Sequence, residues 1–140
     1  MLAQVAIGAF VIFTCIVLQS AMVATAFVQL RRYKQQSRGS ASITKASMIV
    51  GITALWLMLI HAVSILAWAI AFDALDIFPT WDTSIYFSAV AFTTLGFGDV
   101  IPPDEWRQLA GMCAAHGLLV FGVSSAALVE VFRQSFEERD

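Results

Sequence analysis

Two glycines at alternating positions mark the segment Thr93-Thr94-Leu95-Gly96-Phe97-Gly98-Asp99, and two prolines follow it at positions 102 and 103. Glycine adopts left-handed backbone angles at little cost, so this spacing lets successive residues alternate between left-handed and right-handed backbone angles. Carbonyl groups that would otherwise alternate in direction can then all point to one side. A column of carbonyl oxygens can replace the water shell of a cation, so the segment is a candidate cation-binding backbone.

A short apolar stretch at residues 84–93 precedes this segment and must position it. Ten residues make about 15 Å of helix, roughly half the thickness of a bilayer. Thr80 or Asp82 has the side chain needed to cap the start of such a helix. Irregular backbone at membrane depth is tolerated only where protein buries it or water lines it. The half-helix and its glycine-containing return therefore predict a re-entrant loop.

The composition of the 140 residues indicates a membrane protein. Apolar residues make up 59% and charged residues 13% of the chain, whereas soluble domains carry about 25% charged residues. Three apolar runs lie at residues 2–30, 48–72 and 109–132, and each exceeds the roughly 20 residues that span a bilayer as a helix. A cleaved signal peptide is the weaker interpretation of the first run, because no positive charge precedes it and it is too long.

The charges predict the orientation of these helices. Five of the eight basic residues lie between positions 31 and 45, and short basic loops stay in the cytoplasm. The N-terminus is then outside and the C-terminus inside. Residues 73–105 fall on the outer side, where they carry six acidic residues and no basic one.

The glycine-containing segment closely resembles the selectivity filter of potassium channels, which is usually written T-x-G-Y/F-G-D. The resemblance covers about residues 50–132, and this region is similar to the pore domain of two-helix bacterial potassium channels. It implies a homotetramer in the cell membrane that passes K⁺ and holds no cofactor. By position, the filter comprises Thr94, Leu95, Gly96, Phe97 and Gly98, with Asp99 at the outer mouth.

The expected organisation follows from the resemblance together with the hydropathy pattern. The fold class is an all-α membrane protein with three transmembrane helices, a re-entrant pore helix and an extended filter. An N-terminal helix at 1–30 and a basic cytoplasmic loop at 31–45 precede a pore domain at 46–140. Within that domain we expect an outer helix at 46–72, a pore helix at 82–93, the filter at 94–99 and an inner helix at 107–132.

The inner helix is expected to line the pore. Leu118, Phe121, Ser125 and Val129 recur at helical spacing on one face, and by resemblance this face forms the cavity and gate. Gly117 falls where related channels place a gating hinge, although glycines in membrane helices also serve close packing. Both interpretations of Gly117 stay open, whereas close packing is the interpretation that suits Gly111.

Two positions depart from the family pattern. Position 97 is Phe where many relatives have Tyr, and Val90 stands where some bacterial relatives carry a carboxylate that pairs with the filter aspartate. Tyr86 and Trp81 are the candidates to anchor Asp99 instead. We expect a weakly braced filter whose inactivation responds to external potassium.

The remaining features leave alternatives open. His61 and His116 lie within apolar runs, where they serve as pH sensors or as hydrogen-bonded packing residues. Cys15 and Cys113 are expected to be buried thiols. The first helix lacks the regularly spaced arginines that form a voltage sensor. It is expected to pack around the pore or to bind a regulatory partner.

No nucleophile–base pair, metal cluster or phosphate loop appears in the sequence, so an enzyme is not expected, and neither is a nucleic-acid partner. The expected partners are the lipid bilayer, K⁺ ions and other copies of the chain. Two rival functions are a non-selective cation channel and a membrane adaptor whose pore loop is vestigial.

Overall fold

The computed structural model describes residues 2–36 and 43–136, and the side-chain surroundings of residues 4–25 and 43–135. All regular elements in these ranges are helical, which confirms the all-α part of the predicted fold class. In chain order they are α1 (Leu2–Gln36), α2 (Ile43–Ala74), α3 (Trp81–Phe92), the 3₁₀ turn η1 (Asp104–Trp106) and α4 (Arg107–Phe136).

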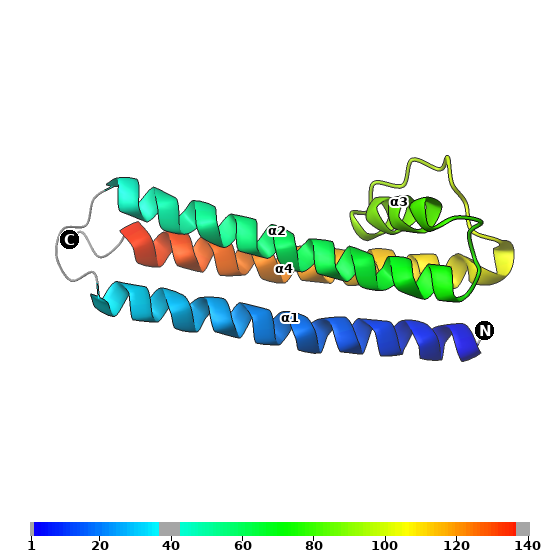
Figure 1. Cartoon of the computed structure of the whole chain (residues 1–140), viewed down its shortest axis with the longest axis horizontal. Coiled ribbons are helices and arrows are strands. Elements are labelled where there is room, and N and C mark those ends of the chain that lie inside the picture. Colours follow the sequence, from blue (N-terminus) through cyan, green and yellow to red (C-terminus); the bar gives the residue numbers. More distant parts are fainter. Residues whose placement is uncertain (1, 37–42, 137–140) are drawn as a thin grey trace.

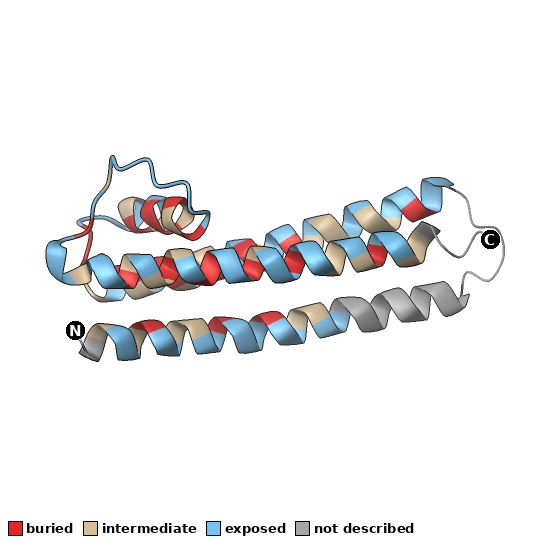
Figure 2. Ribbon diagram, turned by 180° about the vertical axis from the view of Figure 1, so that it is seen from behind, coloured by how far each residue is buried: buried red, intermediate tan, exposed pale blue. Residues whose placement is uncertain are grey.

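Three of these helices are long and apolar enough to cross a membrane. The candidate spans are Gln4–Thr25, Ile43–Ala74 and Asp104–Ser135. They lie side by side as one elongated bundle, while α3 packs at one end of it (Figure 1). Most of the residues whose burial is described along α1 (4–25) and α2 are exposed or only half-buried (Figure 2), as expected where lipid is the solvent. The chain is therefore a multi-pass membrane protein.

The N-terminal end of α1 and the glycine-containing loop lie at the same end of the bundle (Figure 1). The side-chain amide of Gln4 donates a hydrogen bond to the carbonyl of Glu105, next to the start of α4. Helices α1 and α4 therefore run in the same direction, and α2 runs in the opposite one. The start of α2 lies at the far end, beside the C-terminal end of α4.

Aromatic side chains hold α3 against α2. Phe87 of α3 packs edge-to-face on Phe72 with ring centroids 5.3 Å apart, and Phe78 from the connecting loop lies 4.7 Å from Phe87. Each such pair adds about 0.5–1.5 kcal/mol beyond the burial of its surface. Phe72 and Phe92 are fully buried in the same cluster. This aromatic cluster thus fixes the position of α3 on the bundle.

Two hydrogen bonds connect α2 to α4 inside the bundle. The indole Nε1 of Trp68 donates to Nδ1 of His116 at 3.0 Å, and Nε2 of His61 lies 2.9 Å from the Ser124 hydroxyl. Because Nδ1 of His116 accepts a bond, its ring is neutral with the proton on Nε2. Burial of both histidines is confirmed. The geometry agrees with packing roles, and pH sensing stays a hypothesis.

The glycines of α4 differ sharply in their surroundings. A Cβ at Gly117 would lie 1.8 Å from the carbonyl oxygen of Phe92, so the backbones of α3 and α4 touch there. By contrast, a Cβ at Gly111 or Gly122 would meet no atom of the described chain within 4 Å. Within the described chain, close packing is therefore found at Gly117, whereas Gly111, where the sequence suggested it, makes no such contact.

A matched pair of substitutions tests this contact. Gly117→Ala should destabilise the protein by at least about 1–3 kcal/mol, because a methyl group cannot enter a backbone-to-backbone contact without displacing α3. Gly122→Ala should be neutral or stabilising by up to about 1 kcal/mol, as alanine favours a helix more than glycine does. Thermal unfolding in detergent measures both, and equal melting temperatures for the two variants would contradict the contact.

Candidate ion-binding loop

The start and the end of α3 are both fixed by local chemistry. Thr80 caps the start, where its hydroxyl oxygen accepts from the backbone N–H of Thr83 at 3.2 Å. At the other end the N–H of Thr94 donates to Ala91 at 2.9 Å, and that of Leu95 donates to Val90 at 3.0 Å. This bond pattern is a Schellman closure, which turns the chain sharply out of the helix. The loop therefore leaves α3 in a defined direction.

The backbone of the loop alternates in hand. Thr94, Gly96 and Gly98 have positive φ angles of 58°, 58° and 77°, whereas Leu95 and Phe97 between them do not. The alternation is the conformation that the glycine spacing predicted. Thr94 adopts the left-handed region without being glycine, at a cost of about 1–2 kcal/mol. The helix closure at this residue stabilises that conformation, so the strain lies where the loop begins.

Asp99 is anchored by two hydrogen bonds. The Tyr86 hydroxyl of α3 donates to Oδ2 of Asp99 at 2.5 Å, and the backbone N–H of Val100 donates to Oδ1 at 3.0 Å. The hydroxyl of Tyr86 stabilises the charged carboxylate, so the pKa of Asp99 is lower than its usual value and that of Tyr86 is higher. Of the two candidate anchors, the structure brings Tyr86 to Asp99, while Trp81 makes no described bond to it.

Val90 has no carboxylate to pair with Asp99, but its backbone carbonyl binds the start of the loop. Its carbonyl accepts from Leu95 at 3.0 Å and also faces the N–H of Gly96 at 3.4 Å. Its side chain is buried and borders a cavity of about 250 Å³ between the loop and α4, which Gly96, Gly98 and Arg107 also line. The loop is thus held by the Val90 carbonyl near its start and by the Tyr86 hydroxyl at its Asp99 end.

The predicted cavity face of α4 is mostly open in the single chain. Leu118 and Val129 are each 67% exposed, and Ser125 is exposed as well. Phe121 differs, because it is half-buried and packs edge-on against the His61 ring at 4.2 Å. Further along α4, Glu130 pairs with Arg133 at 2.8 Å.

Several expectations lie elsewhere in the chain. Of the predicted basic loop at 31–45, residues 31–36 belong to α1 and residues 43–45 belong to α2. The remaining residues, 37–42, lie outside the described residues. Cys15 and Cys113 are free and buried, as predicted. Gly8 was missed, although a Cβ there would lie 2.6 Å from the Met112 side chain. The only signal for it was a small residue within an apolar run.

A half-membrane helix that ends in an alternating-hand loop between two spanning helices defines the class of re-entrant pore-loop membrane proteins. The family model described as "Ion channel" matches residues 58–134, more than half of the chain, and the chain therefore belongs to this ion-channel family. The match begins within α2 and ends within α4, so it contains the whole loop.

Two named relatives are potassium channels. The chain is 36% identical over 76 residues to the TWiK family of potassium channels protein 18 of Caenorhabditis elegans, covering 52% of this chain and 15% of that protein. It is 28% identical over 104 residues to the cyclic nucleotide-gated potassium channel mll3241 of Mesorhizobium japonicum, covering 73% and 29%. The chain thus spans less than a third of either relative, and no solved structure is significantly similar to it.

The bond between Tyr86 and Asp99 predicts a change in titration. Tyr86→Phe removes the hydroxyl that stabilises the carboxylate, so the pKa of Asp99 should rise towards its ordinary value. A carboxyl with a lowered pKa contributes stability above its unfolded pKa and loses it as the pH falls through the folded pKa. In the variant this loss should be smaller and should be complete at a higher pH, because the folded pKa then lies closer to the unfolded one.

The measurement is a ¹³C NMR titration of side-chain carboxyls in detergent, with Asp99 assigned through Asp99→Asn. Trp81→Phe is the matched control, because it also alters an exposed aromatic residue of α3 but should leave the Asp99 titration unchanged. Superimposable titrations of Asp99 in the parent chain and in Tyr86→Phe would rule out the anchoring role.

Proposed function

We propose that the chain is one subunit of a homotetrameric, potassium-selective channel that conducts K⁺ passively across the cell membrane. Its filter comprises the five residues from Thr94 to Gly98. The observation that carries the proposal is the alternation of left-handed backbone angles at Thr94, Gly96 and Gly98, at the end of a half-membrane helix. Membership of an ion-channel family and two relatives named as potassium channels support it.

The proposed binding chemistry uses backbone carbonyls. Backbone of alternating hand allows the carbonyls of Thr94, Leu95, Gly96 and Phe97 to point to one side, and four chains around an axis then form rings of oxygen atoms. Such rings replace the hydration shell of a K⁺ ion. The C-terminal end of α3 adds the equivalent of roughly half a negative charge at the entry to the loop. Asp99, present once in each subunit, concentrates cations at the mouth.

The exposed loop supports assembly from several chains. Residues 93–99 are exposed in the single chain, including the apolar side chains of Leu95 (56%) and Phe97 (66%). A complete ring of ligands needs several such edges, and the family is one of oligomeric channels. We therefore assign these side chains to contacts with neighbouring subunits or with their pore helices.

The orientation follows from charge. The basic residues between 31 and 45 favour the cytoplasm. Lys45 lies near the start of α2, at the end of the bundle opposite the loop. The N-terminus and the filter mouth are then outside, and α4 descends towards the cytoplasm with Leu118, Phe121, Ser125 and Val129 along the cavity. Bending at Gly117 would also move the end of α3, so a hinge there would couple the gate to the filter.

Reconstitution of the purified chain in a planar bilayer tests the proposal. With potassium on one side and sodium on the other, the reversal potential should lie close to the equilibrium potential of K⁺. A reversal potential near zero would instead indicate a non-selective cation channel. A purified tetramer without any single-channel current would favour the adaptor function.

A second test addresses the backbone conformation itself. Gly98→Ala places a side chain at a φ of 77°, which costs about 1–2 kcal/mol in every subunit and favours a different loop conformation. We expect a loss of K⁺ over Na⁺ selectivity, or of conduction, with the helical content unchanged. Gly51→Ala is the control, because Gly51 lies on an open face of α2. Unchanged selectivity in Gly98→Ala would contradict the filter assignment.

A further inference from the structure

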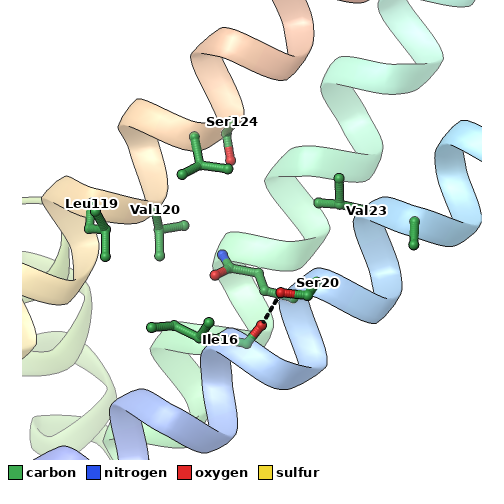
Figure 3. A pocket seen from close by; sticks show the side chains of 9 residues that line it. Ile16, Ser20, Val23, Leu119, Val120 and Ser124 are labelled. Atoms are coloured by element: carbon green, nitrogen blue, oxygen red, sulfur yellow. Dashed lines mark hydrogen bonds between the residues drawn. The ribbon is translucent and has the colours of Figure 1, made fainter.

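A pocket of about 410 Å³ lies between α1 and α4, well away from the glycine-containing loop. Residues 16–24 of α1 form one wall and residues 119–124 of α4 form the other. Ile16 and Val23 of α1 lie across the pocket from Leu119 and Val120 of α4 (Figure 3). The volume lies within the range of about 300–1,000 Å³ that is typical of sites for small molecules.

The depth of the pocket determines what can enter it. Its α1 wall belongs to the candidate span Gln4–Thr25, and its α4 wall lies in the middle of the span Asp104–Ser135. Only molecules that dissolve in the bilayer have ready access to such a site. The walls are almost entirely apolar, so a bound molecule must present an apolar surface over most of its length.

One polar group in the pocket has unused hydrogen-bonding capacity. The Ser20 hydroxyl donates to the Ile16 carbonyl at 2.7 Å, and Ser124 pairs with His61 at 2.9 Å. Gln19 also lines the pocket and is only 9% exposed, yet its amide makes no hydrogen bond to any described residue. An amide has two donors and an acceptor, and leaving them unpaired in an apolar environment is costly.

We propose that this pocket binds a bilayer-soluble amphiphile with an apolar body and a single hydrogen-bonding group, such as a hydroxyl, that pairs with the Gln19 amide. A plain hydrocarbon tail fits the apolar walls but leaves the amide unpaired. The site is independent of which ion the protein conducts.

Photolabelling of the full chain in lipid nanodiscs tests the site. The probe is a medium-chain alcohol with a diazirine at mid-chain, and mass spectrometry maps its adducts. We expect the adducts to concentrate on residues 16–24 and 119–124. 1-Decanol should compete about fivefold better than decane, the factor that corresponds to one hydrogen bond of ordinary strength. In Gln19→Leu this preference for the alcohol should disappear.

Two further variants complete the design. Gln108→Leu makes the same change at an exposed site outside the pocket and should leave labelling and competition unchanged. Val23→Phe should fill the pocket and reduce all labelling there while Gln19 remains present. Circular dichroism and elution volume check that each variant is folded. If Gln19→Leu does not fold, the ratio of 1-decanol to decane competition in the parent chain decides whether the pocket uses a hydrogen bond.

Two results would overturn the proposal. Equal competition by decane and 1-decanol would show an apolar cleft that accepts acyl chains without using the amide. Adducts spread evenly over the three spans would show that the protein has no site between α1 and α4. Neither result depends on ion currents, so the proposed channel function is tested separately.

Discussion

The backbones of α3 and α4 meet where the carbonyl of Phe92 rests against Gly117, with room for no more than a hydrogen atom. This contact determines the depth of α3 along α4. The Schellman closure at Thr94 then determines the direction in which the loop departs, and the bond from Tyr86 to Asp99 returns its far end to the same helix. The loop is thus supported at both ends by α3. The position of α3 in turn depends on its contact with Gly117 of α4 and on the aromatic packing against α2.

Helix α1 contacts α4 unevenly along its length. Near the loop, Gly8 lets α1 approach the Met112 side chain closely, and Gln4 bonds to the backbone beside the start of α4. Further along, the pocket beside Gln19 separates the two helices. The first half of α4 is therefore packed closely against α1. Its second half, which contains the proposed gate, is packed less densely against α1.

The architecture was accessible from the sequence because it depends on hydropathy and on local backbone chemistry. Apolar length predicted the spans, and the spacing of Gly96 and Gly98 predicted the alternating backbone. The rest depends on how the helices are placed against one another. Gly111 and Gly117 are alike in sequence, but they face different directions on α4 and only one meets α3. The unpartnered amide of Gln19 likewise depends on the register between α1 and α4.

The length of α2 has a consequence for the membrane itself. Its uncharged part, from Ala46 to Phe72, rises about 40 Å along the helix axis, whereas the hydrocarbon core of a typical bilayer is about 30 Å thick. A helix with this mismatch tilts, or it thickens the lipid around it, at a modest cost for each ångström of excess. Both α3 and α4 pack against α2, so a change in the tilt of α2 acts on the whole bundle. Bilayer thickness therefore influences the tilt of the bundle, and thicker membranes will favour the arrangement in which α2 is more upright.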